Sequence, residues 1–511
     1  MIRNFKYVLL ASLTFAACSD DDNGSSAADE PITAGSADLS KYVALGDSFA
    51  AGYSDNALFR KGQENSYPNI IASQFALAGG GAFTQPLMVD NIGGFSMGGV
   101  QIPQFPTRLY LGLPNPNVPS PSPMNVPGVS GTVFGTTVNG PVSNLGIPGA
   151  KSFHLTVPGY GQLNPYFGRF ASSPTASVLG DALSQNPTFF SLWIGGNDVL
   201  GYATNGGVPT SQDPVNGNDI TPPATFEAVY SGMVAQLAEG GRKGVIANLP
   251  YINTLPFFTT VPYNPLTTSV LGAGNVAVGE ATVDALNAQL YGPLKQALTA
   301  FGAGDRINLL SKTQGNPLLI KDESLPDLSA QLTAAFTPSL GIATATFYGQ
   351  VFGQARHAKA GTARDFVLLT TRAVIGSAPA GIPAPLNKFG ITYPLQDKHV
   401  LVPSEVTEIA AATDAYNVTI ANAAETHGLA FVDTFAIMNQ LLNGGIRFGN
   451  YHLTATFATG GAFSLDGIHP SARGYGLIAN KFLEAINTTY GSNFKGVDLG
   501  TYPIQYPMNL P

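Results

Sequence analysis

Four short, largely apolar runs of the chain are each followed by turn-forming residues. The runs cover residues 42–45, 189–194, 244–249 and 429–433. Each is apolar along most of its length and does not alternate between apolar and polar positions, which is typical of parallel strands that are buried on both faces. We therefore expect these runs to form strands of one parallel sheet.

Between these runs, apolar residues recur at the three- and four-residue spacing of a helix. The predicted helices lie around residues 226–237, over residues 404–427 with Gly428 as the stop, and around residues 475–486. Ser471 is the predicted N-cap of the last helix. Helix, glycine stop and apolar strand follow one another in turn, and this alternation is typical of a doubly wound α/β fold.

Two long stretches depart from this alternation. Residues 79–142 are dense in Gly, Pro and Asn and predict long loops, whereas residues 251–400 contain a helix at 281–300 and a candidate strand at 306–310. We interpret both stretches as insertions in a single domain that spans residues 41–490 and is followed by a tail at 491–511. A separate cap subdomain within residues 251–400 is the alternative.

The N-terminus predicts export and lipidation. Arg3 and Lys6 precede an apolar run at residues 7–17, which is too short to span a bilayer and is typical of a signal peptide, here residues 1–17. The sequence LTFAAC that ends at Cys18 resembles a bacterial lipobox, in which the cysteine is lipidated. An ordinary signal peptide with an incidental cysteine is the alternative.

The residues after Cys18 are acidic and resemble the surface-export tether of Bacteroidetes-type lipoproteins. This resemblance implies an outer membrane lipoprotein that is exposed at the cell surface and contacts the membrane through its lipid. Residues 18–40, rich in Asp, Ser, Ala and Gly, are predicted to be a flexible tether. No later run of 18 or more apolar residues predicts a transmembrane helix.

Composition limits the partners and cofactors. The net charge is -8 and no cluster of Lys and Arg occurs, which argues against binding to nucleic acid. Charged residues make up 11% of the chain, against an average of about 25%. The single cysteine excludes an intramolecular disulfide and a metal site built from thiolates.

Two serines are candidate nucleophiles. Ser48, in GDSF at residues 46–49, follows a predicted strand, where ligand sites of open α/β sheets lie. Ser96, in GFSMG at residues 94–98, matches the G-x-S-x-G elbow, but two prolines soon after it exclude the helix that an elbow requires. Ser48 is therefore the preferred candidate, although a polar turn would also explain its motif.

A serine needs a base that takes its proton and a group that orients that base. The motif DGIHP at residues 466–470 puts Asp466 three residues before His469, so the carboxylate can contact one ring nitrogen and leave the other for a serine. In GGND, Asn197 follows a strand and offers an amide donor, and in NLGIPGA, Gly149 offers a backbone N–H. Each motif, taken alone, also fits an ordinary turn.

The four blocks GDSF, NLGIPGA, GGND and DGIHP occur in the order of the SGNH, or GDSL, hydrolase family, which the chain therefore resembles over residues 42–490. The first block has Phe49 in place of the family's leucine, and long insertions separate the blocks. The resemblance implies a flavodoxin-like three-layer α/β/α fold, and it implies no metal or organic cofactor.

The resemblance also implies a role for each matching residue. Ser48 would attack an ester carbonyl, His469 would act as general base and then general acid, and Asp466 would orient His469. The backbone N–H groups of Ser48 and Gly149 and the side-chain amide of Asn197 would hold the oxyanion.

The predicted function is a carboxylic ester hydrolase, an esterase or lipase, that forms an acyl-enzyme at Ser48 with an acyl or acetylated ester as substrate. One alternative is removal of O-acetyl groups from glycans. Another is a surface lipoprotein without catalysis that binds glycan or protein on a hydrolase-like scaffold.

Overall fold

A computed structural model describes residues 31–113, 121–211 and 217–510. Within them, five parallel strands form one sheet in the order β13-β8-β7-β1-β6. The strands are β1 (Tyr42–Gly46), β6 (Asn144–Gly146), β7 (Phe189–Trp193), β8 (Lys243–Ala247) and β13 (Ala430–Val432). The four predicted strands are confirmed, and β6 is a strand that was not predicted. The protein is therefore a mixed α/β protein with a parallel sheet.

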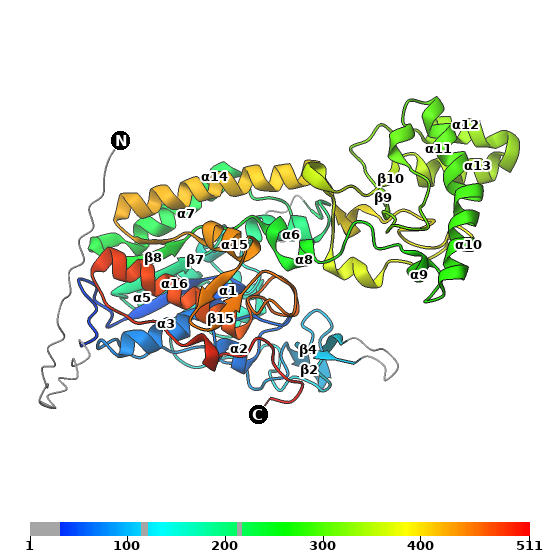
Figure 1. Cartoon of the computed structure of the whole chain (residues 1–511). Coiled ribbons are helices and arrows are strands. Elements are labelled where there is room, and N and C mark those ends of the chain that lie inside the picture. Colours follow the sequence, from blue (N-terminus) through cyan, green and yellow to red (C-terminus); the bar gives the residue numbers. More distant parts are fainter. Residues whose placement is uncertain (1–30, 114–120, 212–216, 511) are drawn as a thin grey trace, which may run out of the picture.

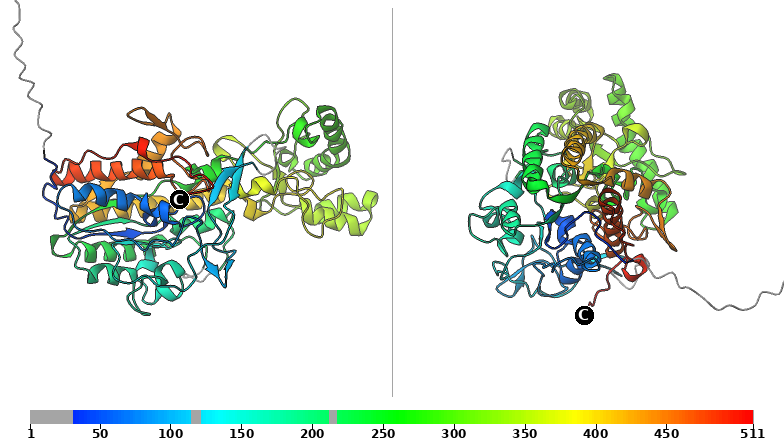
Figure 2. Two further views of the ribbon diagram at one scale, coloured as in Figure 1. Left: turned by 90° about the horizontal axis from the view of Figure 1, so that it is seen from below. Right: turned by 90° about the vertical axis from the view of Figure 1, so that its left-hand side faces the viewer.

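Helices cover both faces of the sheet (Figures 1 and 2). On one face α3 (Tyr67–Ala76) packs against α16 (Ala472–Tyr490), and on the other α7 (Pro223–Leu237) packs against α14 (Pro403–His427). This arrangement follows from right-handed crossovers, because the direction of strand addition reverses at β1. The reversal places the ends of β1 and β7 side by side at a switch point, where α/β proteins bind ligands.

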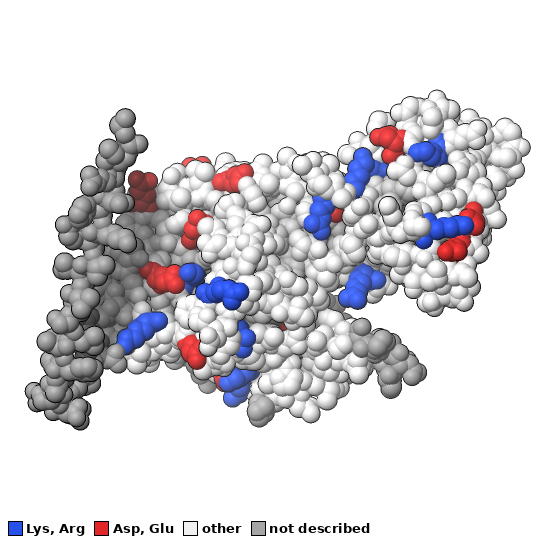
Figure 3. Space-filling view, in the orientation of Figure 1, with Lys and Arg blue, Asp and Glu red and all other residues white. Residues whose placement is uncertain are grey.

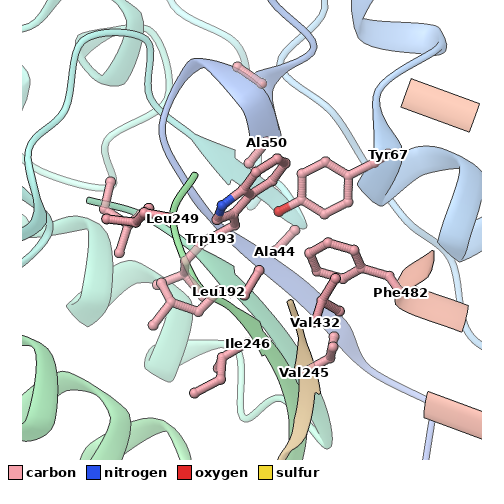
Figure 4. Close-up of a cluster of buried hydrophobic side chains, with 14 of the residues drawn as sticks. Ala44, Ala50, Tyr67, Leu192, Trp193, Val245, Ile246, Leu249, Val432 and Phe482 are labelled. Carbon is pink, nitrogen blue, oxygen red and sulfur yellow. The ribbon is translucent and has the colours of Figure 1, made fainter. Parts of the chain in front are cut away.

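The hydrophobic core explains why the strand sequences are continuously apolar. Every residue of β1 and of β7 is buried, and Figure 4 shows strand side chains packed against Tyr67 of α3 and Phe482 of α16. The central strands thus have no solvent face, as their sequences predict.

The helix ends follow the expected local chemistry. The predicted helix over residues 404–427 is α14, and Gly428 ends it with a φ of +60°, which glycine adopts without strain. Ser471 caps α16, since its Oγ accepts the Gly474 N–H at 3.0 Å. Both predictions are confirmed.

Shorter elements connect the sheet. These are α1 (Ser48–Ala51), α2 (Arg60–Glu64), α4 (Pro165–Gly168), α5 (Val178–Ser184), α6 (Asn197–Thr204), α8 (Pro256–Thr259) and α15 (Thr434–Leu442), with an antiparallel pair β14 (Ile446–Phe448) and β15 (Tyr451–Leu453). The insertion at 79–142 is mostly irregular, as expected, and its described residues also contain the pairs β2 (Ser96–Met97) with β3 (Val100–Gln101) and β4 (Leu109–Gly112) with β5 (Ser122–Asn125).

Residues 260–402 form a lobe that projects to one side of the sheet (Figures 1 and 2). Two hydrophobic clusters lie wholly within the lobe and are distinct from the cluster around the sheet. Its elements are α9 (Thr268–Leu271), α10 (Val276–Leu286), α11 (Gly292–Ala300), α12 (Ser329–Leu340), α13 (Ile342–Phe352), β9 (Leu319–Lys321) paired with β10 (Ala355–His357), and β11 (Phe366–Val367) paired with β12 (Val400–Leu401).

Two predictions fall in the lobe. The helix at 281–300 exists, as parts of α10 and α11 joined by a π-helical turn at Asn287–Tyr291. The strand at 306–310 is wrong, because the chain there is irregular after a 3-10 turn. Ile307 and Leu310 point into a lobe cluster, so their apolar character serves packing and not a sheet.

The prediction of a flexible tether up to residue 40 is wrong for its last part. Cys18, the predicted signal peptide and residues 19–30 lie outside the described residues. From residue 33 onwards the chain packs on the sheet domain: the Ser36 N–H donates to Tyr490 O at 2.8 Å, and Leu39 is 4% exposed. The C-terminal segment also packs on this domain, with Leu499 and Tyr506 buried.

Charged side chains are sparse on the surface. Figure 3 shows scattered acidic and basic side chains, with most of that face uncharged. This follows from the low proportion of charged residues in the sequence.

Candidate active site

Ser48 follows β1, the strand at which the direction of strand addition reverses. It is the first residue of α1, directly after β1 and Asp47. The Asp47 carboxylate caps α1, since its Oδ1 accepts the Phe49 N–H at 2.9 Å. The strand and the cap together fix the backbone on both sides of the Ser48 side chain.

The structure brings Ser48, His469 and Asp466 into one chain of hydrogen bonds. His469 Nε2 lies 2.8 Å from Ser48 Oγ, and His469 Nδ1 lies 2.9 Å from Asp466 Oδ2. Ser48 and His469 are 421 positions apart in the sequence. They meet because β1 ends at Ser48 and the loop at 462–470, which leads into α16, passes over that end of the sheet.

Asp466 is held in one orientation by backbone donors. Its Oδ1 accepts the N–H groups of Ile468 and His469 at 2.9 and 2.8 Å, and its Oδ2 accepts the Asn56 N–H at 2.9 Å. Burial alone would raise the pKa of Asp466, but the charge and hydrogen bonds of His469 and these backbone bonds outweigh it and lower the pKa to about 2. Asp466 is therefore an anion at neutral pH.

This anion decides which ring nitrogen of His469 carries the proton. An ionised carboxylate only accepts hydrogen bonds, so Nδ1 must donate to Asp466 and neutral His469 leaves Nε2 as an acceptor for the Ser48 hydroxyl. A serine whose proton can pass to an oriented imidazole is an activated nucleophile. Phe49 and Tyr53 pack on the imidazole, with ring centroids 5.3 and 4.7 Å from it, and help to fix its plane.

The three predicted oxyanion donors lie on adjacent segments of the same sheet edge. Gly149 follows β6 and Asn197 follows β7, and both strands pair with β1. Asn197 Nδ2 donates to Ala150 O at 2.9 Å, which holds this side chain against the Gly149 loop and leaves one amide hydrogen for a ligand. Within the described residues, the N–H groups of Ser48 and Gly149 donate to no protein acceptor.

Two buried aspartates near the site make structural contacts. Asp47 caps α1, and burial raises its pKa to about 7 despite the Phe49 N–H. Asp198 is fully buried and accepts both the N–H and the hydroxyl of Ser152, at 2.8 and 2.7 Å. These bonds anchor the segment after Gly149 to α6.

The rival serine does not lie in an elbow. Ser96 begins the two-residue strand β2, which pairs with β3 in an antiparallel hairpin, and no helix follows it. The expected absence of an elbow helix after Ser96 is confirmed.

The sequence did not reveal a second set of contacts, which holds the loop that carries Asp466 and His469. The Asp55 N–H donates to Ser464 Oγ at 3.0 Å, and Asp55 Oδ1 accepts the Leu465 N–H at 2.9 Å. Next to it, Asn56 binds Asp466. The polar run SDN at residues 54–56 could have indicated these contacts, but such a run also fits any exposed turn.

Two other histidines, His154 and His427, lie in structural positions. His154 is 4% exposed, stacks on Tyr160 and accepts the Lys151 N–H at 3.0 Å. His427 is the last residue of α14, in the last turn, where basic side chains suit the helix dipole. The described residues contain no group of three or more His, Cys, Asp or Glu side chains arranged to hold a metal ion.

Comparison of the chain with models of protein families, with curated proteins and with solved structures found no match.

Proposed function

We propose that this protein is a serine ester hydrolase that cleaves carboxylic esters through an acyl-enzyme at Ser48. The observation that carries the proposal is the unbroken hydrogen-bond chain from Ser48 through the ring of His469 to Asp466, at 2.8 and 2.9 Å. Its location at the switch point of the sheet supports the proposal, because substrates of α/β enzymes bind there.

In the proposed reaction, Ser48 Oγ attacks the ester carbonyl as its proton passes to His469 Nε2, and Asp466 stabilises the resulting imidazolium. The N–H groups of Ser48 and Gly149 and the amide of Asn197 stabilise the oxyanion. His469 then protonates the departing alcohol. A water molecule, deprotonated by His469, attacks the acyl-enzyme and releases the acid and free Ser48.

We also propose that the fold is the flavodoxin-like three-layer α/β/α fold of SGNH hydrolases. The order β6-β1-β7-β8-β13 supports it, because the second strand along the chain lies beside the first and the others follow on the opposite side. Ser48 and Asn197 follow the two strands at the reversal, as the block order of that family requires.

We infer that Cys18 carries the lipid anchor of an outer membrane lipoprotein at the cell surface. The lipobox-like sequence at residues 13–18 supports this inference. As a separate finding, none of the described helices is long and apolar enough to cross a membrane. The mass of the N-terminal peptide extracted from membranes tests it. An acylated Cys18 as the first residue is expected, whereas an intact Met1 or a free Cys18 thiol would refute the anchor.

Hydrolysis of p-nitrophenyl acetate and butyrate tests the proposed activity. Ser48→Ala and His469→Ala are expected to lower kcat on the order of 10³-fold or more. Ser96→Ala is the control and is expected to retain the wild-type rate. If the wild type is no faster than Ser48→Ala, the enzyme proposal fails and a binding protein on this scaffold remains.

A further inference from the structure

An apolar cavity lies directly beside the candidate active site. Its wall contains the residues on either side of Ser48, the residues on either side of His469, and the residue before Asn197. One end of the cavity is therefore bounded by the segments that carry the proposed nucleophile, the base and an oxyanion donor.

Two helices extend the cavity away from this end. α15 lines it from Thr434 to Leu441 and α16 lines it from Gly474 to Lys481, each with the first, fourth, fifth and eighth residue of the stretch. This spacing puts each set on one face of its helix. A stretch of that length spans about 10 Å at a rise of 1.5 Å per residue. The cavity is thus elongated and runs between the two helices.

The few polar side chains of the wall direct their polar groups elsewhere. The Thr434 hydroxyl donates to Asn248 O, and Lys481 Nζ pairs with Glu484 at 2.8 Å. The Asp47 carboxylate caps α1. The remaining wall is hydrocarbon, aromatic ring and backbone, so a sugar or another polar group inside would lose its hydrogen bonds to water without replacing them.

We propose that this cavity binds the acyl chain of the substrate, so that the preferred esters carry an unbranched acyl chain of medium length, such as octanoyl. This inference rests on the proposed function. The acyl group stays attached to Ser48 through both chemical steps, whereas the alcohol must leave before water attacks. A narrow apolar cavity beside Ser48 suits the group that stays, and apolar cavities readily accept apolar ligands.

The chain-length profile of the full-length protein tests the proposal. Each methylene that moves from water into the cavity contributes a factor of about four. We therefore expect kcat/KM for p-nitrophenyl octanoate to exceed that for the acetate by at least about tenfold. Ethyl octanoate is also expected to be a better substrate than octyl acetate, since the proposal assigns the cavity to the acyl side.

Two neighbouring leucines on α15 test whether the cavity determines the preference for octanoate. Leu441 lines the cavity and is 7% exposed, whereas its neighbour Leu442 is 40% exposed and is not part of the wall. Leu441→Trp is expected to lower the octanoate-to-acetate ratio of kcat/KM at least about tenfold. Leu442→Trp is expected to keep the ratio within about twofold of wild type. If Leu441→Trp does not fold, Ile478→Trp fills the cavity from a half-buried position on α16 with the same expectation.

The proposal is overturned if acetate and octanoate are hydrolysed equally, if the filling variants keep the wild-type ratio, or if octyl acetate is the better substrate. If the wild type hydrolyses no ester, the proposed function fails. Calorimetry with sodium octanoate then tests separately whether the cavity binds an acyl chain. Binding that Leu441→Trp abolishes and Leu442→Trp preserves would support the cavity as an acyl site, and no binding to wild type would overturn it.

Discussion

Two buried carboxylate networks, one in the lobe and one in the candidate site, use similar groups in different ways. In the lobe, the Arg356 guanidinium donates to both oxygens of Asp365 and to Asp322, at 2.5 to 2.7 Å. In the site, Asp466 binds the ring of His469 at 2.9 Å. The lobe pairs two anions with a permanent cation, whereas the site pairs one anion with a ring that can gain and lose a proton.

The difference shows what chemistry requires beyond a buried charge. A guanidinium stays protonated in proteins, so Arg356 can stabilise the lobe but cannot transfer a proton. His469 binds its carboxylate with one nitrogen and keeps the other 2.8 Å from Ser48 Oγ. The site is thus distinguished by a titratable ring that contacts a serine hydroxyl.

The largest expected effect is on catalysis. Asp466→Asn replaces the anion with a neutral amide that does not stabilise the imidazolium and favours the wrong tautomer of His469, so kcat should fall on the order of 10³ to 10⁴-fold. Steady-state hydrolysis of p-nitrophenyl butyrate measures this. Asp365→Asn is the matched change in the lobe, and its kcat should stay within about twofold of wild type. An equal loss of kcat in both variants would show that Asp466 matters no more for catalysis than Asp365 does.

Breaking the lobe network should affect stability and not chemistry. Arg356→Met leaves two buried carboxylates without their cation and should lower the free energy of unfolding by about 3 to 5 kcal/mol. Lys321→Met on the adjacent strand breaks only the exposed pair with Glu323 and should cost less than about 1 kcal/mol. Urea unfolding compares the two variants, and equal costs would show that the buried network does not stabilise the lobe.

The next smaller expected effect concerns Asn197, the proposed oxyanion donor. Asn197→Ala removes an amide expected to bind the transition state more strongly than the substrate, so kcat should fall about 10² to 10³-fold with little change in KM. Separate determination of kcat and KM for p-nitrophenyl butyrate checks this. A wild-type kcat would exclude Asn197 from the oxyanion site.

Another buried carboxyl group, that of Asp55, has no ion-pair partner among the described residues, and its effect on stability depends on pH. Burial raises its pKa to about 7, despite the Leu465 N–H, so the folded protein keeps a proton that the unfolded chain loses near pH 4. The stability from this group is full below about pH 4 and falls as pH rises to about 7, by up to about 1.4 kcal/mol per pH unit. Asp466, with a lowered pKa, has the opposite sign: its contribution is lost only as pH falls towards about 2.

Asp55→Asn tests this sign, because the amide keeps the acceptor for Leu465 and removes the titration. Urea midpoints measured between about pH 4 and pH 7 should show the variant gaining on wild type as pH rises. A difference that does not change with pH would show that Asp55 does not hold an extra proton in the folded state.

Much of the sheet could be predicted because its strands are buried on both faces and therefore continuously apolar. β6 could not be predicted, because its three residues, Asn144–Gly146, include only one large apolar side chain. The strand expected at 306–310 failed for the converse reason. Its apolar residues pack into a lobe cluster, and local sequence does not distinguish such packing from a strand.

The proposed catalytic residues could be predicted because serine chemistry needs particular side chains in short motifs. The contacts that hold these residues in place could not be predicted. Asn56 and Asp466 are 410 positions apart, and their contact is made by a backbone N–H, which every residue except proline carries. The apolar cavity could not be predicted either, because an apolar helix face indicates burial but does not show whether a neighbouring element fills the space against it.

The most direct test of the central claim is the mass of the peptide that contains Ser48 after the protein reacts with diisopropyl fluorophosphate. A phosphorylated Ser48 in the wild type is predicted, with labelling strongly slowed in His469→Ala because the hydroxyl then lacks its base. A protein that hydrolyses esters while Ser48 stays unlabelled, or that is labelled at Ser96 instead, would contradict the account.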